Sequence, residues 1–116
     1  MKKNIIKDKT FKFAIRIVNL SKFLQNKKEF ILSKQILRSG TSIGALIRES
    51  EHAESKADFI HKFAIAQKEA NETEYWLELL FETKFVDNTV YESLKSDVIE
   101  IQKIIASIII SSRKNL

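Results

Sequence analysis

The chain contains no proline, and both of its glycines lie in one short block, residues 35–45, with the sequence QILRSGTSIGA. Proline and glycine are the residues that most strongly destabilise helix interiors, so long stretches without them can remain helical. On both sides of this block, apolar residues recur every three or four positions, which is the spacing of one helix face. The sequence therefore predicts long helices, with the two glycines marking a close approach between two of them.

Four segments carry this helical spacing. The first is expected over about residues 10–25, with Thr10 as its N-cap, and the second over about residues 29–53. The third begins after a capping box formed by Ser55 and Asp58, and the fourth begins after a cap at Asp87 or Thr89. Their core-facing seams are Phe59, Phe63, Ala66, Ala70, Thr73, Leu77 and Leu80 in the third helix, and Val90, Leu94, Val98, Ile101, Ile105 and Ile108 in the fourth. The β-branched end of the fourth segment continues its seam, which favours helix over strand.

Short connections between long helices make successive helices antiparallel. The sequence thus predicts an all-α, antiparallel up-down-up-down four-helix bundle. It forms a single domain over residues 1–116, of which residues 1–9 are a basic N-terminal arm. In the hairpin of the second and third helices, facing residues have numbers with a nearly constant sum. This register sets Gly44 against Phe63 and Gly40 against residues 66–67, and it predicts a structural ion pair of Arg38 with Glu69 and Glu72.

Positive charge is concentrated near the N-terminus. Up to residue 28 there are nine basic residues and one acidic residue, whereas the remainder has eleven basic and fourteen acidic residues. Such asymmetry is typical of a surface that binds an anionic partner, most simply nucleic acid. The sequence predicts nonspecific binding of RNA or DNA through Lys2, Lys3, Lys7, Lys9, Lys12, Arg16, Lys22, Lys27 and Lys28. The alternative is a solvated lysine-rich surface in a structural or protein-interaction oligomer.

Catalytic and metal-binding patterns are weak. Glu49 and His52 have the Glu-x-x-His spacing of di-iron bundles, but those sites need the pair twice, and the second copy is only Asp58 with His61. No base is placed to activate the hydroxyl groups of the glycine block, Ser39, Thr41 and Ser42. We therefore expect no enzymatic activity, no metal and no cofactor.

Two long stretches, LSKQILRSGTSIGALIRES at residues 32–50 and SKADFIHKFAIAQKEANETEYWLELL at residues 55–80, carry a family resemblance. They resemble the bacterial four helix bundle proteins, whose founding members are encoded in intervening sequences of 23S ribosomal RNA genes. The resemblance implies a homopentamer of bundles. It extends to a related branch, the accessory proteins of diversity-generating retroelements, which are basic pentamers that work with a reverse transcriptase and nucleic acid.

The last helix independently favours assembly. Six of the seven residues at positions 104–110 are apolar, whereas a bundle helix needs only about three of seven for its own core. The surplus must face another subunit or remain exposed as an unusually large apolar patch, and we expect a contact with another subunit. A second apolar surface is expected at Tyr75, Trp76 and Leu79, although Trp76 fits the core equally well.

Localisation follows from what interrupts the apolar segments. Lys7, Asp8 and Lys9 break the apolar run that a signal peptide would need, and residues 99–110 are too short and too polar to span a bilayer. The chain has no cysteine, which excludes disulfides. We expect a cytoplasmic protein with no membrane contact.

Overall fold

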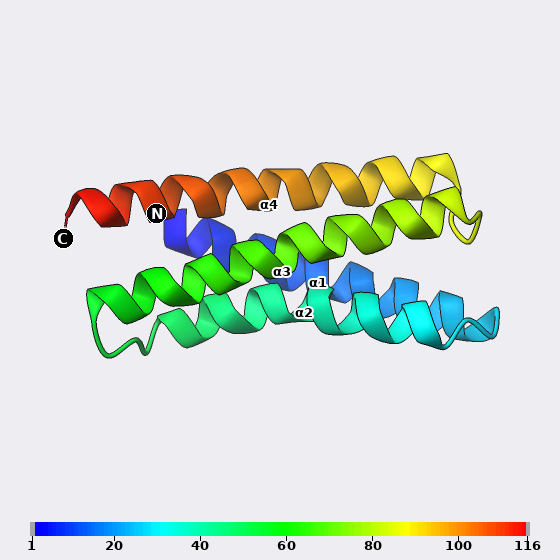
Figure 1. Ribbon diagram of the computed structural model, residues 1–116, viewed down its shortest axis with the longest axis horizontal. Coiled ribbons are helices and arrows are strands. Elements are labelled where there is room, and N and C mark those ends of the chain that lie inside the picture. The colour runs from blue at the N-terminus through cyan, green and yellow to red at the C-terminus, as the bar shows by residue number, and fades with distance from the viewer. Residues whose placement is uncertain (1, 116) are drawn as a thin grey trace.

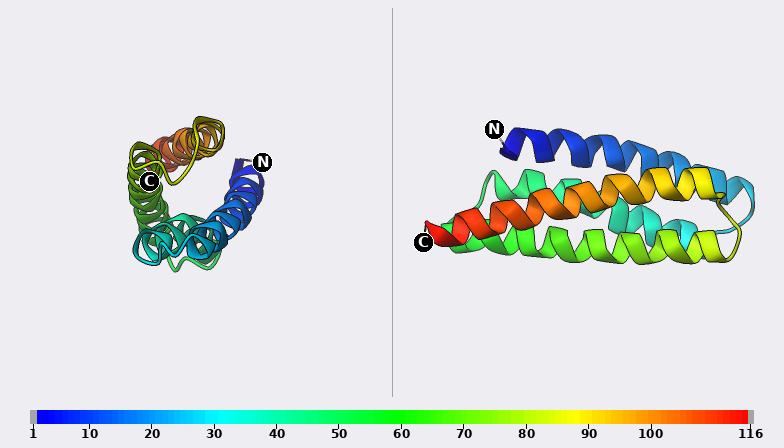
Figure 2. Two further views of the ribbon diagram at one scale, coloured as in Figure 1. Left: turned by 90° about the vertical axis from the view of Figure 1, so that its right-hand side faces the viewer. Right: turned by 90° about the horizontal axis from the view of Figure 1, so that it is seen from above.

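The computed structural model describes residues 2–115, with the side chains of residues 4–115. Within this range the chain forms four helices, α1 (Lys2–Asn26), α2 (Ile31–Ser50), α3 (Lys56–Glu82) and α4 (Asn88–Lys114), and no strand. Successive helices run antiparallel and lie side by side (Figure 1). Viewed end-on, they surround a common core, and α1 meets α4 less closely than it meets α2 (Figure 2). The predicted all-α, antiparallel four-helix bundle is confirmed.

The predicted seams of α3 and α4 form much of the core. Every seam residue of α3 is buried except Phe59, which is half-buried. In α4 the seam is buried from Leu94 onward, while Val90 is 38% exposed at the first turn. Because α4 continues to Lys114, its β-branched end is helical, as predicted. From α1 the core receives Ile6, Phe13, Ile17, Leu20 and Leu24.

Side-chain caps begin α3 and α4 as the sequence predicts. The Ser55 hydroxyl accepts a hydrogen bond from the Asp58 amide at 3.0 Å, and the Asp58 carboxylate accepts one from the Glu54 amide at 3.1 Å. At α4, the Asp87 carboxylate accepts a bond from the Val90 amide at 2.9 Å. Asp87, rather than Thr89, is therefore the N-cap of α4.

The prediction of an arm at residues 1–9 that precedes the first helix is wrong, because residues 2–9 form the first turns of α1. Thr10 is not an N-cap: it is buried, and its hydroxyl donates to the Ile6 carbonyl at 2.8 Å. A threonine hydroxyl can donate to the carbonyl four residues earlier inside a helix, and it can equally accept a bond from a free amide at a helix N-terminus. Since residues 2–9 contain no helix breaker and Ile6 packs in the core, the helix extends through them.

The two glycines of α2 permit close approach, but toward α1. A Cβ atom added at Gly40 would lie 2.8 Å from two side-chain carbons of Ile17, and one at Gly44 would lie 3.3 Å from the Thr10 carbonyl oxygen. The predicted partner of Gly44, Phe63, is therefore wrong, and the facing of Gly40 to residues 66–67 is wrong for the same reason. The flank of α2 that meets α3 carries Ser39, whose hydroxyl accepts a bond from Thr73 at 2.9 Å. The register of the α2–α3 hairpin specifies how far along the bundle axis each glycine lies. It does not specify the rotation of α2 about its own axis, which decides the helix that the glycines face.

Gly40→Leu tests this close approach. We expect it to lower the free energy of unfolding by about 3 kcal/mol, because overpacking a dense contact has costs of this order and Ile17 is stiff at χ1. The measurement is urea denaturation followed by circular dichroism. Ala45→Leu, at an exposed position on the same helix, should change stability by no more than about 0.5 kcal/mol. Equal effects of the two substitutions would show that Gly40 does not determine the spacing of α1 and α2.

Candidate nucleic-acid interface

The predicted basic residues fall into groups with different surroundings. The side chains of Lys2 and Lys3 lie outside the described residues. In the first half of α1, the cations with described side chains have carboxylate partners: Lys7 lies 3.2 Å from Glu51, and Lys12 lies 3.0 Å from Asp8. These cations are already neutralised locally, so a phosphate would have to compete with the carboxylates.

Two further cations of α1 tie it to α4. Lys9 pairs with Glu100, and the hydrogen bond between them raises the pKa of the Lys9 ammonium group. The Arg16 guanidinium lies 2.6 Å from the Asp97 carboxylate and donates to the Ser93 hydroxyl at 2.9 Å. These pairs bridge the two helices where their backbones are least closely packed. Their local role is therefore to join α1 to α4.

The α1–α2 turn presents cations of another kind. Four exposed lysines lie in this turn or in the helical turns on either side of it, at the end of α1 and the start of α2, and in the described part of the chain none has a carboxylate within 4.0 Å. Residues 19–37 contain these four lysines and one glutamate, a net charge of +3. We call them the turn lysines: Lys22, Lys27, Lys28 and Lys34.

The single acidic residue of this segment is engaged by the backbone. The Glu29 carboxylate accepts hydrogen bonds from the amides of Ile31 at 2.8 Å and Leu32 at 2.7 Å, at the N-terminus of α2. A carboxylate at this position is also stabilised by the helix dipole. Glu29 therefore acts as a cap and leaves the turn lysines unpaired.

Sequence reasoning missed Lys34, because it counted charge only as far as residue 28. The hairpin brings α2 back beside α1 at this level, as the bond from the Ser21 hydroxyl to the Ser33 carbonyl at 3.2 Å shows. The register of the α1–α2 hairpin could have predicted this, because it places residues 22 and 34 at nearly the same level along the bundle axis.

Two lysines at this end of the bundle have left-handed backbone. Lys28 follows α1 with φ of 64°, and Lys84 follows α3 with φ of 69°; among the described non-glycine residues, only these have positive φ. Both turns close in the same way, since the Glu29 amide bonds to the Leu24 carbonyl and the Phe85 amide to the Leu80 carbonyl, each at 2.9 Å. Glycine is the residue most often found in this left-handed position after a helix. The chain twice has lysine where glycine would be more stable.

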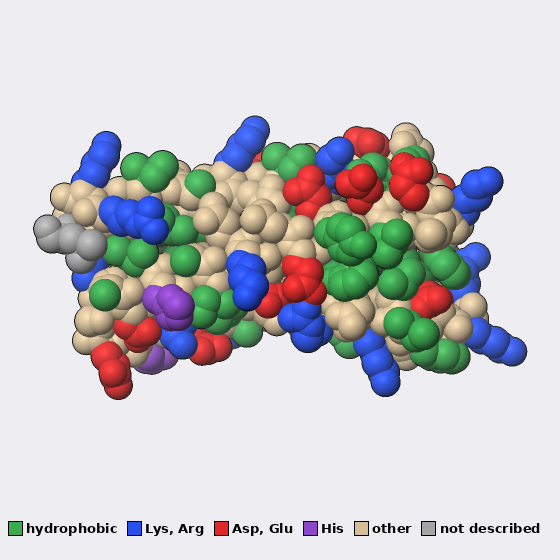
Figure 3. Space-filling model, viewed as in Figure 1, with side chains coloured by type: hydrophobic (Ala, Val, Ile, Leu, Met, Phe, Trp, Pro, Cys, Tyr) green, Lys and Arg blue, Asp and Glu red, His purple; other side chains and the backbone are tan. Residues whose placement is uncertain are grey.

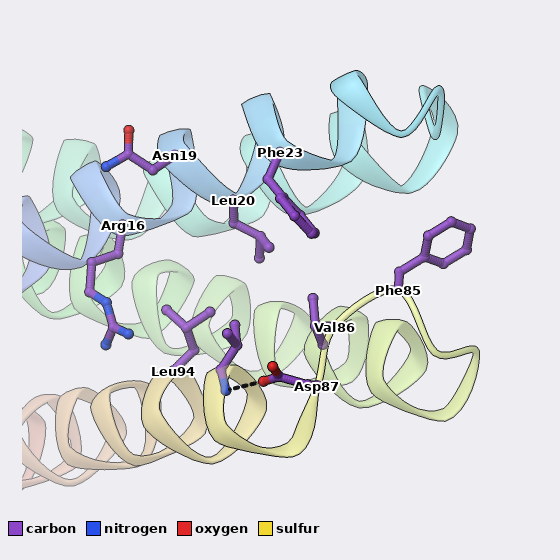
Figure 4. A pocket seen from close by; sticks show the side chains of 9 residues that line it. Arg16, Asn19, Leu20, Phe23, Phe85, Val86, Asp87 and Leu94 are labelled. Carbon is purple, nitrogen blue, oxygen red and sulfur yellow. Dashed lines mark hydrogen bonds between the residues drawn. The ribbon is translucent and has the colours of Figure 1, made fainter.

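Apolar rings lie beside these lysines. A groove of about 420 Å³ separates α1 from the start of α4, and Phe23 points from α1 into it, toward Val86 (Figure 4). A neighbouring groove of about 600 Å³ is lined by Phe23, Phe85, Lys27 and Lys84, together with Phe81, Glu82, Val86 and Asp87. The Lys27 ammonium lies 5.0 Å from the centre of the Phe23 ring, which is a cation–π contact.

The predicted ion pair of Arg38 is present. Its guanidinium lies 3.1 Å from the Glu69 carboxylate and also contacts Glu72, whose carboxylate accepts a bond from the Trp76 indole at 3.0 Å. The Arg38 side chain is 50% exposed. An exposed pair of this kind contributes about 0–1 kcal/mol to stability.

The hydroxyl groups of the glycine block are used within the bundle. Thr41 donates to the Leu37 carbonyl at 2.6 Å, Ser42 donates to the Arg38 carbonyl, and Ser39 pairs with Thr73.

Over residues 4–115, no three side chains of metal-ligating type come together. None of the helices within residues 2–115 combines the length and the apolar character needed to cross a membrane.

The expected apolar surplus of α4 is largely absorbed by its own bundle. Ile109 is buried beside the seam residue Ile108, and Ile104 is half-buried, whereas Ile110 is 57% exposed. The inference that the whole surplus must face another subunit or solvent is therefore wrong. On α3, Trp76 is half-buried and Tyr75 is 59% exposed.

A family model described as "23S rRNA-intervening sequence protein" matches residues 2–107. The chain belongs to this family. A crystal structure of a protein of unknown function from the S23 ribosomal protein family of Bacteroides thetaiotaomicron superposes with a TM-score of 0.92 and 63% identity, over 94% of this chain and 98% of that one. No curated protein is significantly similar to the chain. The predicted resemblance to the 23S rRNA-intervening sequence proteins is confirmed, and the neighbour of unknown function shares the fold of this chain.

Lys28→Gly tests whether the left-handed lysine reduces stability. We expect the substitution to raise the free energy of unfolding by about 1 kcal/mol, since a side chain in this conformation costs about 1–2 kcal/mol and glycine avoids most of it. Thermal unfolding and urea denaturation measure the change. Lys34→Gly, at the fourth residue of α2, should instead lose about 1 kcal/mol through poor helix propensity. A loss of stability in Lys28→Gly would contradict this account.

Proposed function

We propose that this protein is a non-enzymatic, nucleic-acid-associated protein that binds RNA or DNA nonspecifically through the turn lysines. The observation that carries the proposal is a group of four exposed lysines without carboxylate partners, next to a glutamate that is occupied as a helix cap. Membership of the 23S rRNA-intervening sequence protein family is consistent with an RNA partner.

The chemistry of these residues favours phosphate contact over base reading. A lysine ammonium is a compact point charge on a flexible stem, whereas sequence reading relies on bidentate side chains such as arginine, asparagine and glutamine. Phosphate contacts position a protein on nucleic acid but carry no sequence information. This proposal moves the main interface from Lys9, Lys12 and Arg16, which have partners, to the turn.

The triple substitution Lys22→Gln, Lys27→Gln and Lys28→Gln tests the proposal. Binding of a short labelled RNA is followed by fluorescence anisotropy between about 50 and 200 mM salt, the range in which counterion release is steep. Each lost phosphate contact lowers the slope of log affinity against log salt by about 0.7 for a single strand, so we expect a decrease of about 2.

The matched control is Lys7→Gln, Lys9→Gln and Lys12→Gln, which removes the same charge from cations that have carboxylate partners. We expect it to retain most of the affinity. Equal loss in both triple variants would show that only net charge matters, and absence of binding by the unchanged protein would refute the proposed function.

A second candidate function is a structural or protein-interaction homo-oligomer. Its support is an apolar strip on the outside of α1, where Phe11 is 51% exposed and Ile15, one turn later, is 48% exposed. Hydrophobic side chains also gather on the face drawn in Figure 3. Clustered apolar surface is characteristic of protein contacts. We propose self-assembly, with five subunits as the number implied by the family resemblance.

Ile15→Glu tests self-assembly, with light scattering of the purified protein as the measurement. The unchanged chain should give a multiple of its 13.5 kDa monomer mass, five-fold for a pentamer, and the variant should shift toward the monomer. Gln35→Glu, at an exposed polar position on α2 and away from this strip, controls for added charge. A monomer mass for the unchanged protein at micromolar concentration would exclude this candidate.

A further inference from the structure

We infer that the end of the bundle bearing the turn lysines prefers single-stranded to double-stranded nucleic acid, because phenyl rings lie among its cations. This inference rests on the proposed function and specifies its ligand. At this end Phe23 is 45% exposed and Phe30 is 56% exposed, and Phe85 is half-buried. Large aromatic side chains are normally buried, so their exposure beside unpaired cations calls for a ligand with both apolar faces and negative charge.

The rings and the ammonium groups are interleaved. Phe23 is adjacent to Lys22 in the sequence and lies one turn before Lys27, whose ammonium contacts the ring. Phe30 follows Lys28 after a single residue. The left-handed backbone at Lys28 joins these two parts of the surface. A polynucleotide strand has the same alternation, with a charged phosphate and a flat base in every nucleotide.

The groove shared by the two hairpin ends offers a place for a base. Phe23 and Phe85 line it from α1 and from the α3–α4 connection, and Lys27 and Lys84 lie along it. Its volume of about 600 Å³ falls within the about 300–1,000 Å³ usual for small-ligand sites. Of its acidic residues, Asp87 is turned to the Val90 amide, as the dashed line in Figure 4 shows.

Strand preference follows from which surfaces each nucleic acid exposes. In a duplex the faces of the bases are covered by their neighbours, so only the phosphates can meet the turn lysines. In a single strand the base faces are free to stack on a phenyl ring, and each such contact contributes about 1–3 kcal/mol. One stacked base at the low end of this range corresponds to a roughly fivefold tighter complex.

An anionic membrane surface would fit this end less well. Phe23 lines two grooves and does not stand on a protruding face, and Glu82 and Asp87 line one of them. A lipid surface presents a continuous plane of negative headgroups that cannot enter a groove, whereas a strand can direct a base into the groove and keep its phosphates at the lysines.

The experiment compares a short single-stranded RNA of mixed sequence with its duplex by anisotropy at about 50 mM salt, where phosphate contacts are strong. The full chain, Phe23→Leu and Phe30→Ser are titrated. We expect single-strand affinity to exceed duplex affinity at least about fivefold and to fall by a similar factor in each variant, with duplex affinity unchanged. Ile31→Ser, which removes an exposed apolar side chain but no ring from the same end of the bundle, should bind as the unchanged protein does.

The outcomes separate this inference from the proposed function. Equal affinity for single strand and duplex, with both lost in the lysine variant, would overturn the strand preference and leave the proposed function standing. Absence of binding to either would overturn both. Binding to phosphatidylserine vesicles that Phe30→Ser loses, without a strand preference, would also overturn the inference and assign the surface to membranes. If Phe23→Leu does not fold, as judged by circular dichroism, Phe30→Ser decides the result, since Phe30 is exposed.

Discussion

The close approach of α1 and α2 at the two glycines sets the geometry of the bundle. With no Cβ at Gly40 or Gly44, α2 packs against the Ile17 side chain and the backbone at Thr10. The first helix is thereby held against α2, and ion pairs such as Arg16 with Asp97 join its other flank to α4. Ion pairs can span a gap that apolar side chains would leave as a void, and the grooves beside Phe23 lie along this looser seam.

The features that could be predicted from the sequence are those set by residues close together along the chain. The seams of α3 and α4, the Ser55 cap and the register of Arg38 against Glu69 all depend on spacing along a helix or across one short turn. The rotation of α2 could not be obtained in this way. A glycine beside a core-facing stripe can lie toward either neighbouring helix, and only the packing of all four helices decides between them. The start of α1 was missed because Thr10 serves helix interiors as well as caps.

The candidate site shows a similar division. The sequence indicated where positive charge is concentrated, but charge counts cannot reveal which cations are paired. The partner of Arg16 is 81 positions away, and the closing contact of the bundle brings them together. Three of the nine predicted cations, Lys22, Lys27 and Lys28, remain unpaired at the turn, and Lys34 joins them through the hairpin. The composition thus showed that this surface is positively charged, whereas the packing of the helices decides which of its cations lack a carboxylate partner.

The two ends of the molecule are unlike each other. Both lysine-bearing connections lie at one end, whereas the start of α1, the end of α4 and the α2–α3 connection lie at the other (Figure 1). The longest dimension of the bundle is 47 Å, and its helices are continuous over most of that length. A domain, tag or support attached at the start of α1 or at the end of α4 would therefore lie at the end of the bundle opposite the turn lysines and would leave them open to solution.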